Sequence, residues 1–198
     1  MKEIWDETYD DDAYAFGTEP NDFLREMVHH LPPKSKLLCL AEGEGRNAVF
    51  LASQGFSVSA IDQSEVGQQK AKKLAEQENV TFAYDVVDIS DYDMGHDKWD
   101  GIVAIFAHTE PDVRQKMIQG AKDGLKIGGV FLLEGYNKEQ LTYGSGGPKE
   151  HYKMFSLAEL KDAFNDFIII KAENTIRDIH EGEYHDGTSS VVQFIAKK

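Results

Sequence analysis

Two acidic residues, each at the end of a short apolar run, carry the chemistry that this sequence suggests first. One run stops at Glu42, and Gly43 and Gly45 then precede an amphipathic helical pattern. Glycines at this spacing let the backbone turn tightly over a helix N-terminus, a common binding place for adenosine-containing ligands. Twenty positions after Glu42, a second apolar run ends at Asp62, whose carboxylate can accept hydrogen bonds from both ribose hydroxyls. Together these signals predict a nucleoside bound across the ends of two adjacent strands.

Two nucleoside ligands compete for this loop. Gly43, Gly45 and Ala48 fit the dinucleotide fingerprint, with Ala in the third place, so NAD(P) and an oxidoreductase form the main alternative. Three features favour S-adenosylmethionine instead. Glu42 would face a pyrophosphate, whereas it could receive the ammonium of the methyl donor. The chain has no Tyr-x-x-x-Lys pair of the short-chain dehydrogenase type, and the predicted sheet ends in an antiparallel hairpin.

The elements that must position these residues alternate between strands and helices. The pattern predicts strands over 36–41, 57–61, 80–86, 99–106, 129–136, 167–179 and 189–196, and helices over 21–30, 46–54, 65–78, 111–124 and 156–165. The last two strands are too close in sequence for a crossover helix, so they must pair antiparallel. We therefore predict an α/β fold, a doubly wound, Rossmann-like, seven-stranded and mostly parallel sheet with an antiparallel C-terminal hairpin strand.

Length and composition limit the remaining choices. We expect a single domain over 1–198, made of an N-terminal lid and helix (1–31), a donor-binding core (36–136), an acceptor loop (137–155) and a C-terminal helix and hairpin (156–198). A net charge of −14 disfavours nucleic acid as a partner. No secretory signal or membrane-spanning apolar run is evident, so we expect a cytoplasmic protein, monomeric or dimeric.

Three motifs give the chain a family resemblance. The segments Leu-Cys-Leu-Ala-Glu-Gly-Glu-Gly-Arg-Asn (38–47), Ala-Ile-Asp-Gln-Ser (60–64) and Val-Val-Asp-Ile-Ser (86–90) resemble class I S-adenosylmethionine-dependent methyltransferases. Among these, the chain is most similar to the tellurite-resistance and thiopurine-methyltransferase-like group. The resemblance implies methyl transfer from S-adenosylmethionine to a small acceptor, such as a thiol or a chalcogen oxyanion, with S-adenosylhomocysteine as the product. A protein that binds the donor without turnover is a further alternative.

The same resemblance assigns roles around the donor. It places Glu42 against the methionine part, although the family often has the shorter Asp there, and Asp62 at the ribose. Gln63 would lie beside the adenine, Asp88 would accept from its exocyclic amine, and the backbone of Ile89 would donate to the ring. The predicted donor-binding residues are Phe16, Gly17, Glu42, Gly43, Gly45, Asn47, Asp62, Gln63, Asp88, Ile89 and Phe106.

The acceptor side follows from topology, because ligands of open parallel sheets bind beyond the carboxyl ends of the strands. This rule brings His108, Tyr136 and His185 to one rim as catalytic candidates. His108 is the preferred general base, since an imidazole titrates near neutral pH, whereas a thiolate or chalcogenide anion would need no base. The segments 14–21 and 143–151 are candidate lids. No zinc-type spacing occurs among the acids and histidines of 180–185, so we predict no metal site.

Overall fold

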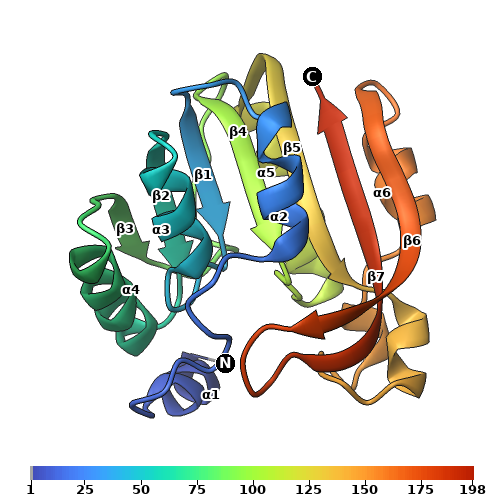
Figure 1. Ribbon diagram of the computed structural model, residues 1–198. Helices are drawn as coiled ribbons and strands as arrows, with labels where there is room; N and C mark the ends of the chain where they lie inside the picture. Colours follow the sequence, from blue (N-terminus) through green and yellow to red (C-terminus); the bar gives the residue numbers. More distant parts are fainter. Residues whose placement is uncertain (1) are drawn as a thin grey trace.

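The computed structural model describes residues 2–198, and its seven strands form one sheet (Figure 1). They are β1 (Lys36–Leu40), β2 (Ser57–Asp62), β3 (Ala83–Val86), β4 (Trp99–Ile105), β5 (Leu125–Tyr136), β6 (Ile168–His180) and β7 (Asp186–Lys197). Their order is β3-β2-β1-β4-β5-β7-β6, and the pairings of β7 with β5 and with β6 are antiparallel, while the others are parallel. The predicted fold is therefore confirmed, including the antiparallel strand of the hairpin.

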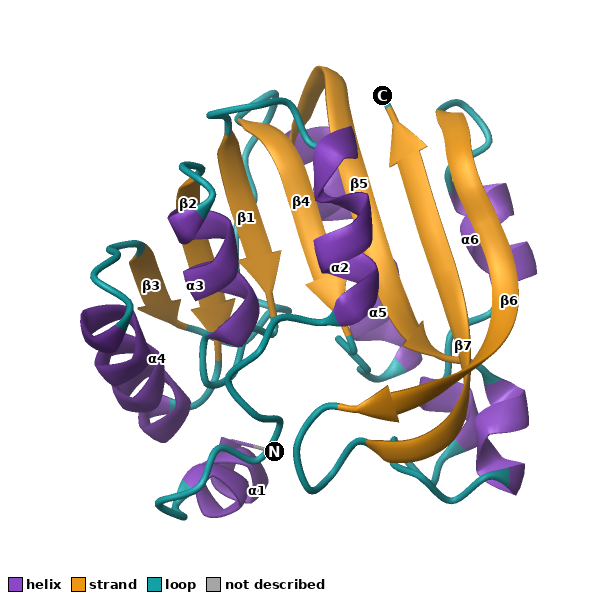
Figure 2. Ribbon diagram, in the orientation of Figure 1, coloured by secondary structure: helices purple, strands orange, loops and turns teal. Residues whose placement is uncertain are grey.

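Helices cover both faces of this sheet. The α-helices are α1 (Lys2–Tyr9), α2 (Asp22–Met27), α3 (Arg46–Ser53), α4 (Glu65–Gln77), α5 (Pro111–Gly124) and α6 (Leu157–Ala163). Three short 3₁₀ helices are η1 (Val28–His30), η2 (Lys138–Thr142) and η3 (His151–Lys153). Figure 2 shows α2 and α3 in front of the sheet and α5 and α6 behind it. Within residues 2–198, no helix combines the length and the apolar character that crossing a membrane requires.

Strand β1 shows why its sequence is apolar without interruption. Leu37 and Cys39 pack with the core on the side of α2 and α3, whereas Leu38 and Leu40 pack with the core on the side of α5 and α6. Because successive side chains of a strand point to opposite faces, a strand covered on both sides needs apolar residues at every position. Strand β1 is thereby fixed inside the sheet, between β2 and β4, and its carboxyl end delivers Glu42 to the rim.

The structure differs from the sequence-based expectation at the N-terminus. Helix α1 was not predicted, because its acidic residues obscure a short apolar face. That face is nevertheless visible in the spacing of Ile4, Trp5, Thr8 and Tyr9, which recur at helical intervals. The helix is held on α4 by a hydrogen bond of 2.6 Å from Ser64 Oγ to the carboxylate of Asp6. It therefore lies at the carboxyl ends of the strands rather than on a face of the sheet.

Candidate functional site

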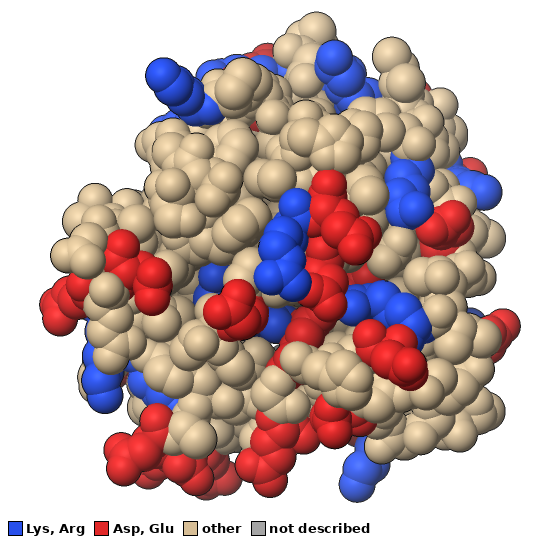
Figure 3. All heavy atoms as spheres, in the orientation of Figure 1, with Lys and Arg blue, Asp and Glu red and all other residues tan. Residues whose placement is uncertain are grey.

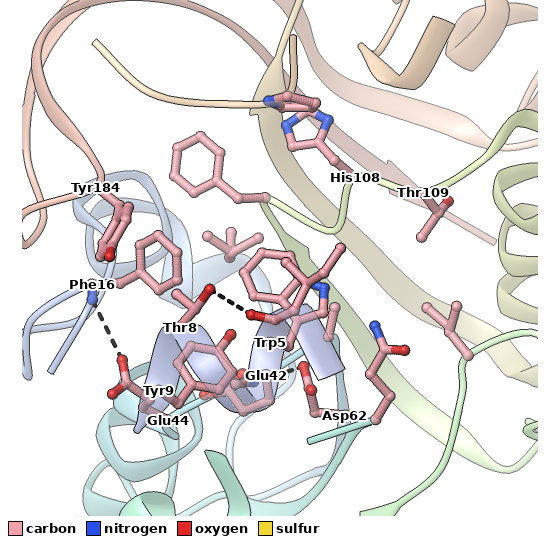
Figure 4. A pocket seen from close by; sticks show the side chains of 18 of the residues that line it. Trp5, Thr8, Tyr9, Phe16, Glu42, Glu44, Asp62, His108, Thr109 and Tyr184 are labelled. Carbon is pink, nitrogen blue, oxygen red and sulfur yellow. Dashed lines mark hydrogen bonds between the residues drawn. The ribbon is translucent and has the colours of Figure 1, made fainter. Parts of the chain in front are cut away.

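A cavity of about 480 Å³ lies at the carboxyl ends of the parallel strands (Figure 4). The predicted site residues that line it are Phe16, Gly17, Glu42, Gly43, Asn47, Asp62, Gln63, Asp88, Ile89, Phe106, His108 and His185. Gly45 and Tyr136 do not line it. The sheet thus brings donor and acceptor candidates that follow β1 to β4, and others from the C-terminal hairpin, to one space.

Asp62 is the anchor of the loop between β1 and α3. Its Oδ2 accepts the backbone N–H of Gly43 at 3.0 Å, and its Oδ1 accepts that of Ser64 at 2.9 Å. The phenol of Tyr84 donates to the carbonyl oxygen of Gly43 at 2.6 Å and holds the loop from its other side. Each Asp62 oxygen keeps a further lone pair, since a carboxylate oxygen can accept two hydrogen bonds. Burial raises the pKa of this carboxyl, so a ligand hydroxyl that donates to it would offset part of its desolvation.

The two glycines of the loop have different functions. Gly43 has a φ of 59°, and a Cβ there would lie 2.6 Å from the phenol oxygen of Tyr9, so this glycine admits α1 over the loop. Gly45 has a φ of 89°, and its Cβ would lie 2.5 Å from the Cβ of Ala71 in α4. The absence of a side chain at Gly45 thus serves the packing of α3 against α4, and a contact of Gly45 with the donor stays a prediction.

The other acids of the donor half are also held by backbone amides. Glu42 Oε1 accepts the N–H of Ala48 at 2.6 Å, and burial raises the pKa of Glu42 to about 7. Asp88 accepts the N–H of Ser90 at 2.8 Å through one oxygen, and this bond shapes the turn after β3.

Asn47 accepts the N–H of Asn21 at 2.9 Å through its side-chain oxygen. It thereby ties the N-terminal segment to α3.

Helix α1 supplies a part of the cavity wall that the sequence analysis missed. Figure 4 shows Trp5, Thr8 and Tyr9 among the residues that surround the same space as Glu42 and Asp62. The rings of Trp5 and Tyr9 are stacked, with centroids 5.7 Å apart. The helix therefore places an apolar cover over the polar loop.

Arg46 is the second feature that the sequence analysis missed. It is 7% exposed, and its Nη2 donates to Glu181 at 2.7 Å. Glu181 also accepts from Arg177 at 2.9 Å and from Asn21 at 3.0 Å, so the tip of the hairpin is bonded to α3 and α2. Acidic and basic side chains lie against one another in a central band of the face in Figure 3. Within the described part of the chain, Nη1 of Arg46 has no hydrogen-bond partner, although this side chain lines the cavity.

The candidate base His108 has a structural function. Its Nδ1 donates to the carbonyl oxygen of Lys153 at 3.1 Å, and its Nε2 accepts the backbone N–H of Tyr136 at 3.0 Å. The two partners fix the tautomer and leave neither nitrogen free for a substrate. Burial also lowers the pKa of His108 to about 4. This geometry argues against His108 as the base, and its catalytic role stays a prediction.

Tyr136 and His185 lie differently with respect to the cavity. Tyr136 is fully buried and stacks on His108, and a Cβ on Gly147 would approach the tyrosine ring to 2.5 Å. Tyr136 is therefore covered from the cavity, and its catalytic role stays a prediction. His185 does reach the cavity, with its ring 4.5 Å from that of Phe16 and 4.4 Å from that of Phe106. Burial, together with Arg46, lowers the pKa of His185 to about 3, so the imidazole is neutral.

The tip of the hairpin pairs its charged residues without gathering them around one point. His180 bonds to Asp186 at 2.6 Å in an exposed position, whereas Glu181 turns inward to the arginines. Across residues 2–198, no group of three or more His, Cys, Asp or Glu side chains has the arrangement of a metal site.

Comparison with known proteins identifies the family of this chain. The sequence model described as tellurite resistance protein TehB matches residues 3–196. The chain belongs to the TehB family. This is a family of S-adenosylmethionine-dependent methyltransferases with the class I fold, as the sequence motifs indicated. A comparison with curated proteins gave no significant match.

Several solved structures share the fold at low sequence identity. TehB from Haemophilus influenzae is 20% identical with a TM-score of 0.72, and the match covers 100% of this chain and 66% of that one. A structure that concerns the conversion of a disulfide bond into a thioacetal group during echinomycin biosynthesis is 14% identical with a TM-score of 0.77. The match covers 100% of this chain and 92% of that one. A Burkholderia thailandensis 1,6-didemethyltoxoflavin-N1-methyltransferase with bound S-adenosylhomocysteine is 18% identical with a TM-score of 0.70, covering 100% and 86%.

Proposed function

We propose that this TehB-family chain binds S-adenosylmethionine in the cavity and methylates a small-molecule acceptor, such as a thiol, a chalcogen oxyanion or a similar metabolite. The observation that carries the proposal is the Asp62 carboxylate, which is buried, held by two backbone N–H groups and left with lone pairs at the cavity. A carboxylate fixed in this way at the end of β2 suits a ribose diol.

The adenine would lie between the ends of β2 and β3. Gln63 follows Asp62 directly, and Asp88 and Ile89 follow β3 on the adjacent strand, so all three reach the same half of the cavity. Asp88 uses one oxygen for its turn, which leaves the other for the exocyclic amine of adenine. The backbone N–H of Ile89 would donate to the adenine ring.

The methionine part of the donor would meet Glu42 and Arg46 at the start of α3. Its ammonium pairs with Glu42 once this carboxyl is ionised, and its carboxylate accepts from the unpartnered Nη1 of Arg46. Both side chains are buried, so each charge would gain more from a partner than it would in water. The N-terminus of α3 adds a partial positive charge beside the same carboxylate.

The residues around the donor would act by position and by exclusion of water. S-adenosylmethionine supplies an activated methyl group on a sulfonium, which is a good leaving group. Trp5, Tyr9 and Phe16 cover the cavity and keep water from competing with the acceptor. Phe106 and His185 lie at the end of the cavity away from Asp62 and limit how the acceptor approaches. Alignment of this kind can contribute several kcal/mol to the acceleration.

Calorimetric titration tests the proposal. S-adenosylmethionine and S-adenosylhomocysteine should bind with micromolar affinity, and NAD and NADP should not bind. Binding of the nicotinamide nucleotides alone would show that Glu42 and the hairpin point to the wrong ligand. Turnover with any acceptor would then separate an enzyme from a protein that only binds the donor.

The assignment of Arg46 has its own test, because 5′-methylthioadenosine lacks the amino-acid part of the donor. The wild-type protein should bind S-adenosylhomocysteine more tightly than 5′-methylthioadenosine, and Arg46→Met should reduce this preference by about tenfold, or ~1.4 kcal/mol. Arg25→Met is the matched control, since Arg25 lies on the surface of α2 outside the cavity. An unchanged preference in Arg46→Met would place the carboxylate elsewhere.

A further inference from the structure

The tip of the C-terminal hairpin, residues 180–186, packs against the N-terminal segment and reaches the cavity. Figure 1 shows the hairpin of β6 and β7 bending toward that segment. The backbone N–H of Tyr184 donates to the carbonyl oxygen of Ala15 at 3.4 Å. Within the tip, the N–H of Glu181 donates to the carbonyl oxygen of His185 at 2.8 Å and closes the turn. The tip therefore has a defined backbone beside the cavity, which Tyr184 and His185 line.

Glu181 turns inward from this tip and both of its oxygens are bonded. It is 6% exposed, and its Oε2 accepts from Nη2 of Arg46 at 2.7 Å. Its Oε1 accepts from Arg177 at 2.9 Å and from Asn21 at 3.0 Å. Although burial raises the pKa of Glu181, Arg46 and Arg177 hold it below its ordinary value, so the carboxylate is ionised. The side chain of Glu181 is thereby fixed in one place.

The guanidinium of Arg46 is held from one side only. Its Nη2 is bonded to Glu181, and no other side chain within residues 2–198 bonds to this guanidinium. Its Nη1 has no hydrogen-bond partner among the same residues, although Arg46 lines the cavity. An arginine side chain has many rotamers, and fixing it before a ligand arrives removes that entropic cost from binding. The bond to Glu181 therefore prepares one end of Arg46 and leaves the other end available.

We infer that Glu181 is a positioning residue, which holds Arg46 in the rotamer that meets the carboxylate of S-adenosylmethionine. This inference rests on the proposed function. Glu181 is not among the residues that line the cavity, so it acts on the donor through Arg46. The hairpin that carries it belongs to the edge of the sheet opposite β2 and β3. Both halves of the sheet thus take part in recognition of the donor.

Glu181 also has an electrostatic effect of the opposite sign, because its carboxylate repels that of the donor. Two features limit this repulsion. Arg177 contacts the other oxygen of Glu181 at 2.9 Å and offsets part of its charge. Nη1 and Nη2 of Arg46 carry separate N–H groups, so the guanidinium can donate to two carboxylates at once. We therefore expect the gain from a fixed guanidinium to exceed the loss from repulsion, and a variant reveals the sign of the difference.

The test compares two ligands by calorimetry. S-adenosylhomocysteine carries the amino-acid part of the donor, and 5′-methylthioadenosine lacks it. Glu181→Ala should lower the preference for S-adenosylhomocysteine about fivefold and leave the affinity for 5′-methylthioadenosine within about twofold of the wild type. A merely structural loss would weaken both ligands alike and leave the preference unchanged. Glu183→Ala is the matched control with wild-type preference, because Glu183 is an exposed acid of the same turn outside the cavity.

A second pair of variants shows whether the effect passes through Arg46. In the Arg46→Met protein, addition of Glu181→Ala should change the preference by less than about twofold, since the arginine that Glu181 positions is gone. The thermal transition reports whether each variant is folded. Glu181→Gln keeps the size of the side chain and one acceptor oxygen, so it carries the test if Glu181→Ala does not fold, with an expected loss of preference of about twofold or more.

The outcomes separate this inference from the proposed function. A wild-type protein that does not bind S-adenosylhomocysteine would overturn the proposed function, and this inference with it. Binding by the wild type, with an unchanged preference in the folded Glu181 variants, would overturn the inference and leave the proposed function intact. A preference that rises would show that Glu181 competes with the donor for Arg46. An equal loss with and without Arg46 would show that Glu181 acts by another route.

Discussion

Replacement of Asp62 by alanine should weaken donor binding more than any other single loss of charge in the cavity. Asp62 holds the loop through Gly43 and the turn through Ser64, and the proposed function adds the ribose hydroxyls to the same two oxygens. The substitution therefore removes direct contacts with the ligand and also leaves two backbone donors near the ligand without their acceptor.

The magnitude follows from these bonds. Loss of the hydrogen bonds to a buried or charged partner weakens the free energy of binding by about 1–3 kcal/mol in total, because water replaces part of each lost bond. Because ~1.4 kcal/mol is a factor of ten, the dissociation constant for S-adenosylhomocysteine should rise about 5- to 150-fold. Loss of the buried charge relieves some desolvation, so the folded state itself should survive the substitution.

Calorimetry with S-adenosylhomocysteine measures the effect, and the thermal transition reports whether each variant is folded. Asp85→Ala is the matched control, because it removes one exposed acid from the neighbouring strand β3 and so changes the net charge by the same amount. Its affinity should equal that of the wild type. If folded Asp62→Ala bound the ligand as tightly as the wild type, the carboxylate would not contact the ribose and the orientation of the donor would have to be revised.

Three further predictions concern the loop, its electrostatics and its cover. Gly45→Ala should lower the free energy of unfolding by about 1–3 kcal/mol more than Gly55→Ala in urea titrations, since both glycines have a φ near 85–89° but only Gly45 would force a Cβ to within 2.5 Å of Ala71. Burial raises the pKa of Glu42 from its ordinary 4.5 to about 7, so the folded state keeps this proton to a higher pH than the unfolded chain does. Stability should therefore fall as pH rises from about 4.5 to 7, and urea titrations of Glu42→Gln should lack this part of the fall. Trp5→Ala should raise the dissociation constant of S-adenosylhomocysteine about tenfold (~1.4 kcal/mol) by uncovering the donor half of the cavity, and an unchanged constant would show that α1 is not part of the binding site.

The parts of the fold that local pattern controls could be predicted from the sequence. The continuous apolar run of β1 indicated a strand covered on both faces, and the short connection before β7 required an antiparallel pair. The position of Asp62 at the end of β2 followed from the same pattern. Topology then brought the residues at the strand ends to one rim, and most of the predicted positions line the cavity there.

The parts that depend on distant partners could not be predicted. A histidine directly after a strand is a residue type that can act as a base. His108, however, bonds to backbone groups of Lys153 and Tyr136, and no local sequence pattern indicates those partners. Gly45 has the spacing of a ligand-binding glycine, yet the nearest atoms belong to Ala71 of another helix. Residue type gave the range of possible functions in both cases, and tertiary contacts selected one.

The charged side chains around the rim illustrate this limit most clearly. From residue types alone, Arg46, Arg177 and Lys153 near one rim would favour an anionic substrate. In the structure, Glu181, which is 135 positions from Arg46 in sequence, bonds to both arginines, and Glu110 pairs with Lys153. Because oppositely charged side chains in contact offset one another, residue type alone did not reveal how much of this positive charge is neutralised. The charge that a ligand meets at this rim is therefore a property of the folded chain.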